Sequence, residues 1–98
     1  MLGDRFDAET ALSLGILNKV VPPADREQES RSLALRLAEG PTIALGRTKA
    51  LLQASLTSDL EGQLKAEKES FAHCAATDDF TEGMMAFMQK RPPEFRGE

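Results

Sequence analysis

Residues 77–95 read TDDFTEGMMAFMQKRPPEF, and this stretch predicts one complete amphipathic helix followed by a basic turn. The helix is expected to begin at Thr77 or Asp78, where the carboxylates that follow place negative charge at the positive end of the helix dipole. Gly83 lies where a missing side chain would permit close packing against a neighbour. The apolar residues that recur at helical spacing, and that we expect to be buried, are Phe80, Met84, Phe87 and Met88.

The acidic residues at this helix start offer a second interpretation. Asp78, Asp79 and Glu82 are oxygen donors of the kind that bind metal ions. They lie in one short helix start, however, without the alternating loop positions and the glycine of a calcium-binding loop. The capping interpretation is therefore favoured, and no metal site is predicted.

Composition limits the classes of function. The 98 residues carry a net charge of −4, and basic residues lie among the acidic ones, which argues against the broad basic face that a nucleic-acid partner needs. A single cysteine excludes an intrachain disulfide and a CxxC metal site. No apolar run approaches the roughly 18 residues needed to span a bilayer, and no signal pattern opens the sequence. We expect one modest domain in the cytoplasm or an organelle matrix.

The rest of the chain predicts more helices. Without tryptophan or tyrosine, and with only five phenylalanines, the core must consist mainly of leucine, alanine and methionine, which favours helical structure. The fold class expected is mainly α, a small bundle of about five helices with one short extended segment. The four helices expected before the last one run over residues 8–14, about 24–39, about 42–54, and from Ser58 onward.

Local signals set several of these boundaries. Asp7 can cap the first helix and Gly15 can end it in a left-handed conformation. Ser58 and Glu61 match a capping box. The apolar run from Ile16 to Val21 predicts a strand or a buried extended segment. Because a lone strand cannot satisfy its own backbone and no comparable second strand is present, part of the structure is expected to lie outside this chain.

Three residues of the fourth helix are candidates for chemistry. Glu67 projects into the apolar stripe of Leu60, Leu64, Phe71 and Cys74, and it is expected either to pair with a nearby base at the rim or, less favourably, to act as an acid or base. His73 lies on the opposite side and is expected to be solvated. Cys74 is interpreted as a small core residue, since no basic neighbour at helical spacing would lower its pKa.

The basic end of the last helix is the strongest candidate for binding. Lys90 and Arg91 can simply stabilise the helix C-terminus through its dipole. Alternatively, Phe87 and Lys90, which are neighbours at helical spacing, offer an apolar plane and a cation to a nucleotide-like ligand. Both interpretations remain open on the residues alone.

Four blocks of the sequence resemble the C-terminal third of enoyl-CoA hydratases of the crotonase superfamily. The most specific is the last one, Thr77-Asp78-Asp79 with Glu82-Gly83-Met84, Ala86-Phe87, Lys90-Arg91 and Phe95. The others are residues 3–22 with Leu14-Gly15-Ile16-Leu17-Asn18 and Val20-Val21-Pro22, Gly40-Pro41 with Ala44 and Thr48-Lys49, and Glu67-Lys68 with Phe71. The resemblance covers essentially the whole chain. Thr10 and the pair Pro92-Pro93 depart from the family pattern.

The resemblance implies a fold, an activity and a set of contacts. Residues 1–22 would leave a spiral core that is absent here, and residues 23–98 would form the C-terminal helical domain. In the family, backbone amides and glutamates of that core carry out the hydration of trans-2-enoyl-CoA. No catalytic residue and no cofactor is therefore assigned to this chain, and acyl-CoA is the expected substrate. The helices would cover the CoA site and support oligomer contacts. By position, Phe87 and Lys90 would lie near the adenine end of CoA.

Two functions from different classes therefore compete. One is a part of an enoyl-CoA hydratase or isomerase that contributes to CoA binding and assembly but is inactive alone. The other is a self-standing helical interaction module that self-associates through its apolar faces. The unpaired apolar run at residues 16–21 favours the first, whereas the well-capped helices from Ala24 onward favour autonomous folding.

Overall fold

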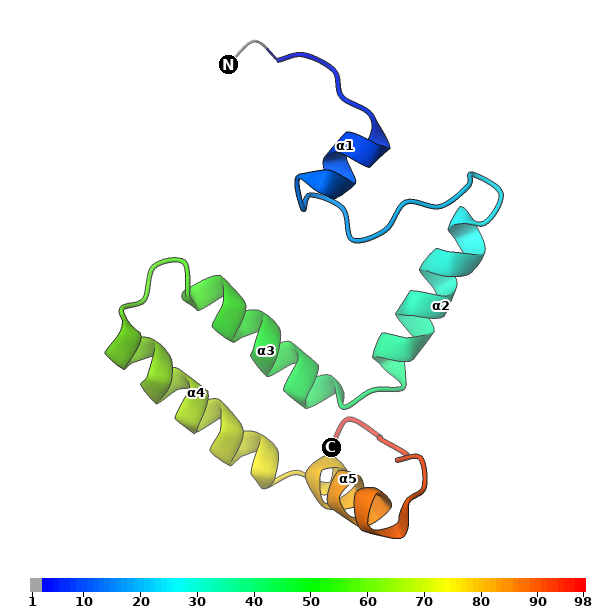
Figure 1. Cartoon of the computed structure of the whole chain (residues 1–98). Helices are drawn as coiled ribbons and strands as arrows, with labels where there is room; N and C mark the ends of the chain where they lie inside the picture. The colour runs from blue at the N-terminus through cyan, green and yellow to red at the C-terminus, as the bar shows by residue number, and fades with distance from the viewer. Residues whose placement is uncertain (1–2) are drawn as a thin grey trace. The chain divides into compact units, whose positions relative to one another are not determined.

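The structure is a computed structural model that describes residues 3–98 and contains five helices (Figure 1). This confirms the mainly helical fold class. Their bounds are α1 Ala8–Ser13, α2 Arg26–Ala38, α3 Thr42–Ala54, α4 Leu60–Ala75 and α5 Asp78–Gln89. Within residues 3–98, no helix is both long enough and apolar enough to cross a membrane.

The chain divides into two compact units, one ending at Leu33 and the other comprising Ala34–Glu98. In the first unit, Asp7 caps α1 as predicted, its carboxylate accepting the Thr10 N–H at 2.8 Å. Gly15 ends the helix with φ 73°, and the Ile16 N–H then donates to the Ala11 carbonyl at 2.9 Å. The glycine is required here because other residues rarely adopt that conformation.

Of the two forms predicted for Ile16 to Val21, a strand or a buried extended segment, the strand is wrong, since no strand forms within residues 3–98. The turn after α1 uses the amides of both Ile16 and Leu17, which donate to the Ala11 carbonyl. Ile16 is 62% exposed rather than buried, and only Val20 and Val21 are partly covered. The physical reason is the one anticipated for a lone strand: without a partner, its backbone groups have nothing to pair with.

The second unit is built on α3, α4 and α5. Helices α3 and α4 lie antiparallel and pack on each other, and α5 packs against the end of α4 (Figure 1). The N-cap of α4 is Asp59, whose carboxylate accepts the Gly62 N–H at 2.8 Å, so the prediction of a capping box from Ser58 is wrong. Ser58 instead donates its hydroxyl hydrogen to the Ala54 carbonyl, which closes the turn after α3.

The apolar stripes expected to be buried are largely exposed. On α5, Phe87 is 83% exposed, and on α4, Phe71 is 67% exposed. The other exposed residues of the two stripes are Leu60, Leu64, Phe80, Met84 and Met88, whereas Cys74 is half-buried. Helical periodicity shows which side of a helix is apolar, but burial also requires a second layer on that side. Within residues 3–98, the only buried apolar side chains are Ala11 and Ala86.

Candidate functional site

The C-terminal tail folds back along α5 and is held by a buried carboxylate at the start of that helix. Thr77 is the N-cap, accepting the Phe80 N–H through its hydroxyl oxygen. Asp79 is only 4% exposed, and its carboxylate accepts the N–H groups of Arg96 at 2.7 Å and Gly97 at 2.9 Å. Asp79 therefore binds the tail as well as placing charge at the helix start.

The tail also contacts the backbone of α5 and the start of α3. The Asp79 N–H donates to the Glu98 carbonyl at 2.9 Å, so the two segments exchange hydrogen bonds. The Phe95 ring packs over Gly83, where an added Cβ would lie 3.5 Å from it, which identifies the neighbour that the glycine was predicted to face. Gly97 has φ 77°, and a Cβ there would come within 2.5 Å of the Thr42 hydroxyl at the start of α3.

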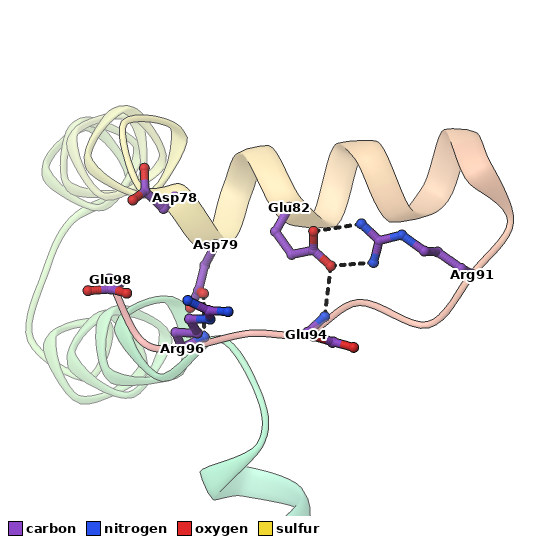
Figure 2. Close-up of a pocket in the computed structure, with 7 residues that line it drawn as sticks. All are labelled: Asp78, Asp79, Glu82, Arg91, Glu94, Arg96 and Glu98. Atoms are coloured by element: carbon purple, nitrogen blue, oxygen red, sulfur yellow. Dashed lines mark hydrogen bonds and ion pairs between the residues drawn. The ribbon is translucent and has the colours of Figure 1, made fainter.

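A second carboxylate fixes the other end of α5. Glu82 accepts two hydrogen bonds from the Arg91 guanidinium, at 2.6 and 2.7 Å, and a third from the Glu94 N–H at 2.8 Å (Figure 2). The hydrogen bonds from Arg91, and then that from Glu94, lower the pKa of Glu82 from 4.5 to about 2. The same contact raises the pKa of Arg91. We call Glu82, Arg91 and Glu94 the Glu82 bracket.

The bracket encloses the sharp end of α5 at Lys90. The Lys90 N–H donates to the Phe87 carbonyl and the Arg91 N–H to the Ala86 carbonyl, a hydrogen-bond pair that ends many helices. Lys90 itself is left-handed, with φ 54° and ψ 39°. Because α5 ends at Gln89, Lys90 does not continue the helical spacing from which Phe87 and Lys90 were predicted to be neighbours. Both side chains are nevertheless exposed at the same end of α5.

Two cavities flank this region. A charged one of about 380 Å³ lies between α5 and the tail and is lined by Asp78, Asp79, Glu82, Arg91, Glu94, Arg96 and Glu98 (Figure 2). A second, of about 260 Å³, is almost entirely apolar and is bounded by the start of α3, the end of α4, α5 and Phe95. Within residues 3–98, no cluster of three or more acidic, histidine or cysteine side chains could hold a metal ion.

Comparison with known proteins decides the family. The family model described as enoyl-CoA hydratase/isomerase matches residues 1–98. This chain belongs to the enoyl-CoA hydratase/isomerase family.

Individual members of the family are similar over nearly the whole chain. A crotonyl-CoA hydratase from Syntrophomonas wolfei is 33% identical over 92 residues, which are 94% of this chain and 35% of that protein. A 1,2-epoxyphenylacetyl-CoA isomerase from Escherichia coli is 33% identical over 99% of this chain and 37% of its own length. The crystal structure of an enoyl-CoA hydratase from Polaromonas superimposes with a TM-score of 0.90 at 31% identity, covering 96% of this chain and 37% of that one. This chain thus spans little more than a third of the relatives it matches.

The three candidates on α4 of this family member make no hydrogen bond to the tail within residues 3–98. Glu67 is exposed and accepts a hydrogen bond from the Gln63 amide at 3.2 Å, so its partner is a neighbouring amide and not the base that was expected. His73 is exposed, as predicted. Cys74 is a free, half-buried thiol that lines the apolar cavity.

The roles of Asp79 and Glu82 were missed by sequence reasoning, which treated both as helix-start charges. The backbone N–H groups that bond to these carboxylates belong to residues after the Pro92-Pro93 pair, which cannot continue the helix, whereas Arg91 lies just before it. That pair was the available signal for a reversal. It does not specify which carboxylates the returning backbone meets.

Proposed function

We propose that this chain is the C-terminal helical part of an enzyme that hydrates trans-2-enoyl-CoA in fatty-acid β-oxidation, in the cytoplasm. The observation that carries the proposal is the match of the enoyl-CoA hydratase/isomerase model to residues 1–98. The hydratase assignment rests on relatives such as the Syntrophomonas crotonyl-CoA hydratase. The isomerase among the relatives marks the other reaction that the same family supports.

The chemistry of hydration would take place outside this chain. The resemblance implies two backbone N–H groups that stabilise a developing enolate, and glutamates that position water and move a proton. Each of these contributions is worth on the order of 10²-fold or more in rate. The resemblance maps none of these groups onto residues 1–98, and Glu67, exposed and bonded to Gln63, is given no part in the reaction.

The contribution of this chain would be contact with CoA. Phe87 is 83% exposed and offers an aromatic face on which a purine can stack. Lys90, three residues further along, is also exposed and offers an ammonium to phosphate oxygens. Arg91 is less suited to that role because its guanidinium already pairs with Glu82.

The second contribution would be to assembly. Large apolar side chains are exposed on α3, α4 and α5, among them Leu52, Phe71 and Met88. So many exposed apolar side chains beside so few buried ones favour a second protein surface that covers them. The same observation favours the alternative function, a helical module that associates with itself and has no catalytic role. CoA binding separates the two, because the alternative has no reason to bind it.

The test uses a hybrid hydratase, in which this chain replaces the region that it matches in the Syntrophomonas enzyme. Calorimetry of the hybrid with CoA should show that Lys90→Ala weakens binding about tenfold, the loss expected for one charge-assisted contact. Lys68→Ala, on the exposed face of α4, is the matched control and should leave the affinity unchanged. Equal affinities for the two variants would remove Lys90 from the CoA site.

A further inference from the structure

Lys90 holds an unfavourable backbone conformation. Among residues 3–98 it is the only residue other than glycine with a positive φ, at 54°. The left-handed region is disfavoured for residues with a Cβ, and glycine is the usual occupant of this position at the end of a helix. Strain of this kind persists only where the surrounding structure holds it in place, and it is concentrated at functional sites.

The backbone on both sides of Lys90 is fixed. Before it, the last turn of α5 is closed by the bonds to the Ala86 and Phe87 carbonyls, at 3.0 and 3.2 Å. After it, the Glu82 bracket holds the Arg91 side chain and the Glu94 N–H. The two prolines between Arg91 and Glu94 have restricted φ angles, which limits the freedom of the connecting segment. Lys90 is thus the corner of a loop that is closed at both ends.

The two adjacent cations of this corner differ in availability. Arg91 is neutralised by a bidentate ion pair with Glu82. The ion pairs formed within residues 3–98 are this one and Lys19–Glu29, and neither involves Lys90. The positive charge that remains available at this corner is therefore that of Lys90, three residues after the exposed Phe87.

From this geometry we propose that Glu82 and Arg91 are positioning residues: they hold Lys90 in its left-handed conformation and so direct its ammonium to a phosphate group of the ligand that stacks on Phe87. The inference rests on the proposed CoA contact and assigns the residues that prepare it. A cation on a fixed backbone loses less freedom when it binds, so the affinity gained from the contact is larger. Arg91 acts through Lys90 and does not itself touch the ligand.

A double-mutant cycle in the hybrid hydratase tests this, with the CoA dissociation constant measured by calorimetry. Lys90→Ala should weaken binding about tenfold and Arg91→Ala about three- to tenfold. The double variant should bind no more weakly than Lys90→Ala alone, because Arg91 has nothing left to position. Full multiplication of the two effects would overturn the inference, since Arg91 would then contact the ligand directly. So would an Arg91→Ala variant with unchanged affinity.

Two further variants keep the result separate from a loss of folding. Arg91→Lys retains the charge but not the bidentate geometry, and it should fall between the parent and Arg91→Ala. Lys90→Gly relieves the left-handed strain and removes the cation, so it should raise the thermal midpoint while weakening CoA binding. A lower midpoint for Lys90→Gly would contradict the strain argument.

A measurement without CoA distinguishes failure of this inference from failure of the proposed function. A spin label on Lys90→Cys, in a Cys74→Ser background, should show restricted motion that Arg91→Ala increases. A label on Lys68→Cys should not respond to Arg91→Ala. If the label at position 90 is equally mobile with and without Arg91, positioning is excluded whatever the CoA result. If its motion responds but Lys90→Ala leaves CoA affinity unchanged, the bracket fixes the corner and the proposed CoA contact is the part that fails.

Discussion

Replacing Asp79 with asparagine should release the C-terminal tail from α5. The carboxylate is 4% exposed and accepts two backbone N–H groups, from Arg96 and Gly97. Asparagine keeps one acceptor oxygen and turns an NH₂ group towards the other N–H, so one charge-assisted bond is lost and the second is weakened.

The magnitude follows from those two bonds. Hydrogen bonds to charged groups contribute about 1.5–3 kcal/mol each, and the released tail amides recover part of this by bonding to water. We therefore expect Asp79→Asn to lower the free energy of unfolding by about 2 kcal/mol. For a unit of this size, that corresponds to a fall of roughly 8–16 °C in Tm.

Thermal unfolding followed by circular dichroism measures the loss, and amide hydrogen exchange at Arg96 and Gly97 locates it. Asp78→Asn is the matched control, because Asp78 is the adjacent carboxylate, is exposed, and makes no hydrogen bond to the tail within residues 3–98. It should cost about 0.5 kcal/mol through the helix dipole alone. The reasoning is refuted if both variants lose the same stability, or if exchange at Arg96 and Gly97 is unaltered by Asp79→Asn.

Two more predictions concern charge and capping. Because the pKa of Glu82 falls from 4.5 to about 2 on folding, its stabilising contribution is complete above pH 4.5 and is lost as the pH falls towards 2. In urea titrations, Glu82→Gln should be less stable than the parent above pH 4.5, with a difference that shrinks towards pH 2; a constant difference would contradict the ion-pair origin. Asp59→Ala should cost about 1 kcal/mol through the lost cap on Gly62, and Ser58→Ala less than about 0.5. If chemical denaturation shows that Ser58→Ala costs more stability than Asp59→Ala, the capping box predicted from Ser58 would be correct.

The sequence predicted best what depends on neighbouring residues. Asp7, Gly15 and Thr77 act over three or four positions, and the structure confirms each. The α4 cap was misplaced by one residue because Ser58 and Asp59 are both good caps, and only the turn after α3 decides between them.

Long-range contacts and burial were not predictable in the same way. Asp79 meets a backbone N–H 18 residues away, and no local pattern encodes that pairing. The apolar side chains of Phe71 and Phe87 were assigned to the correct helices, but their periodicity gives no information on what covers them. Recognition of the family came from short blocks whose structural role, at Glu82 and Arg91, became visible only in the folded chain.

The most direct test of the central claim is the rate at which crotonyl-CoA loses its double-bond absorbance. We predict turnover by the hybrid hydratase, and none above background by this chain alone or by the Syntrophomonas enzyme lacking the matched region. That result would make this chain a necessary part of a hydratase that cannot act by itself. Turnover by the isolated chain, or a folded hybrid no faster than the truncated enzyme, would contradict the account.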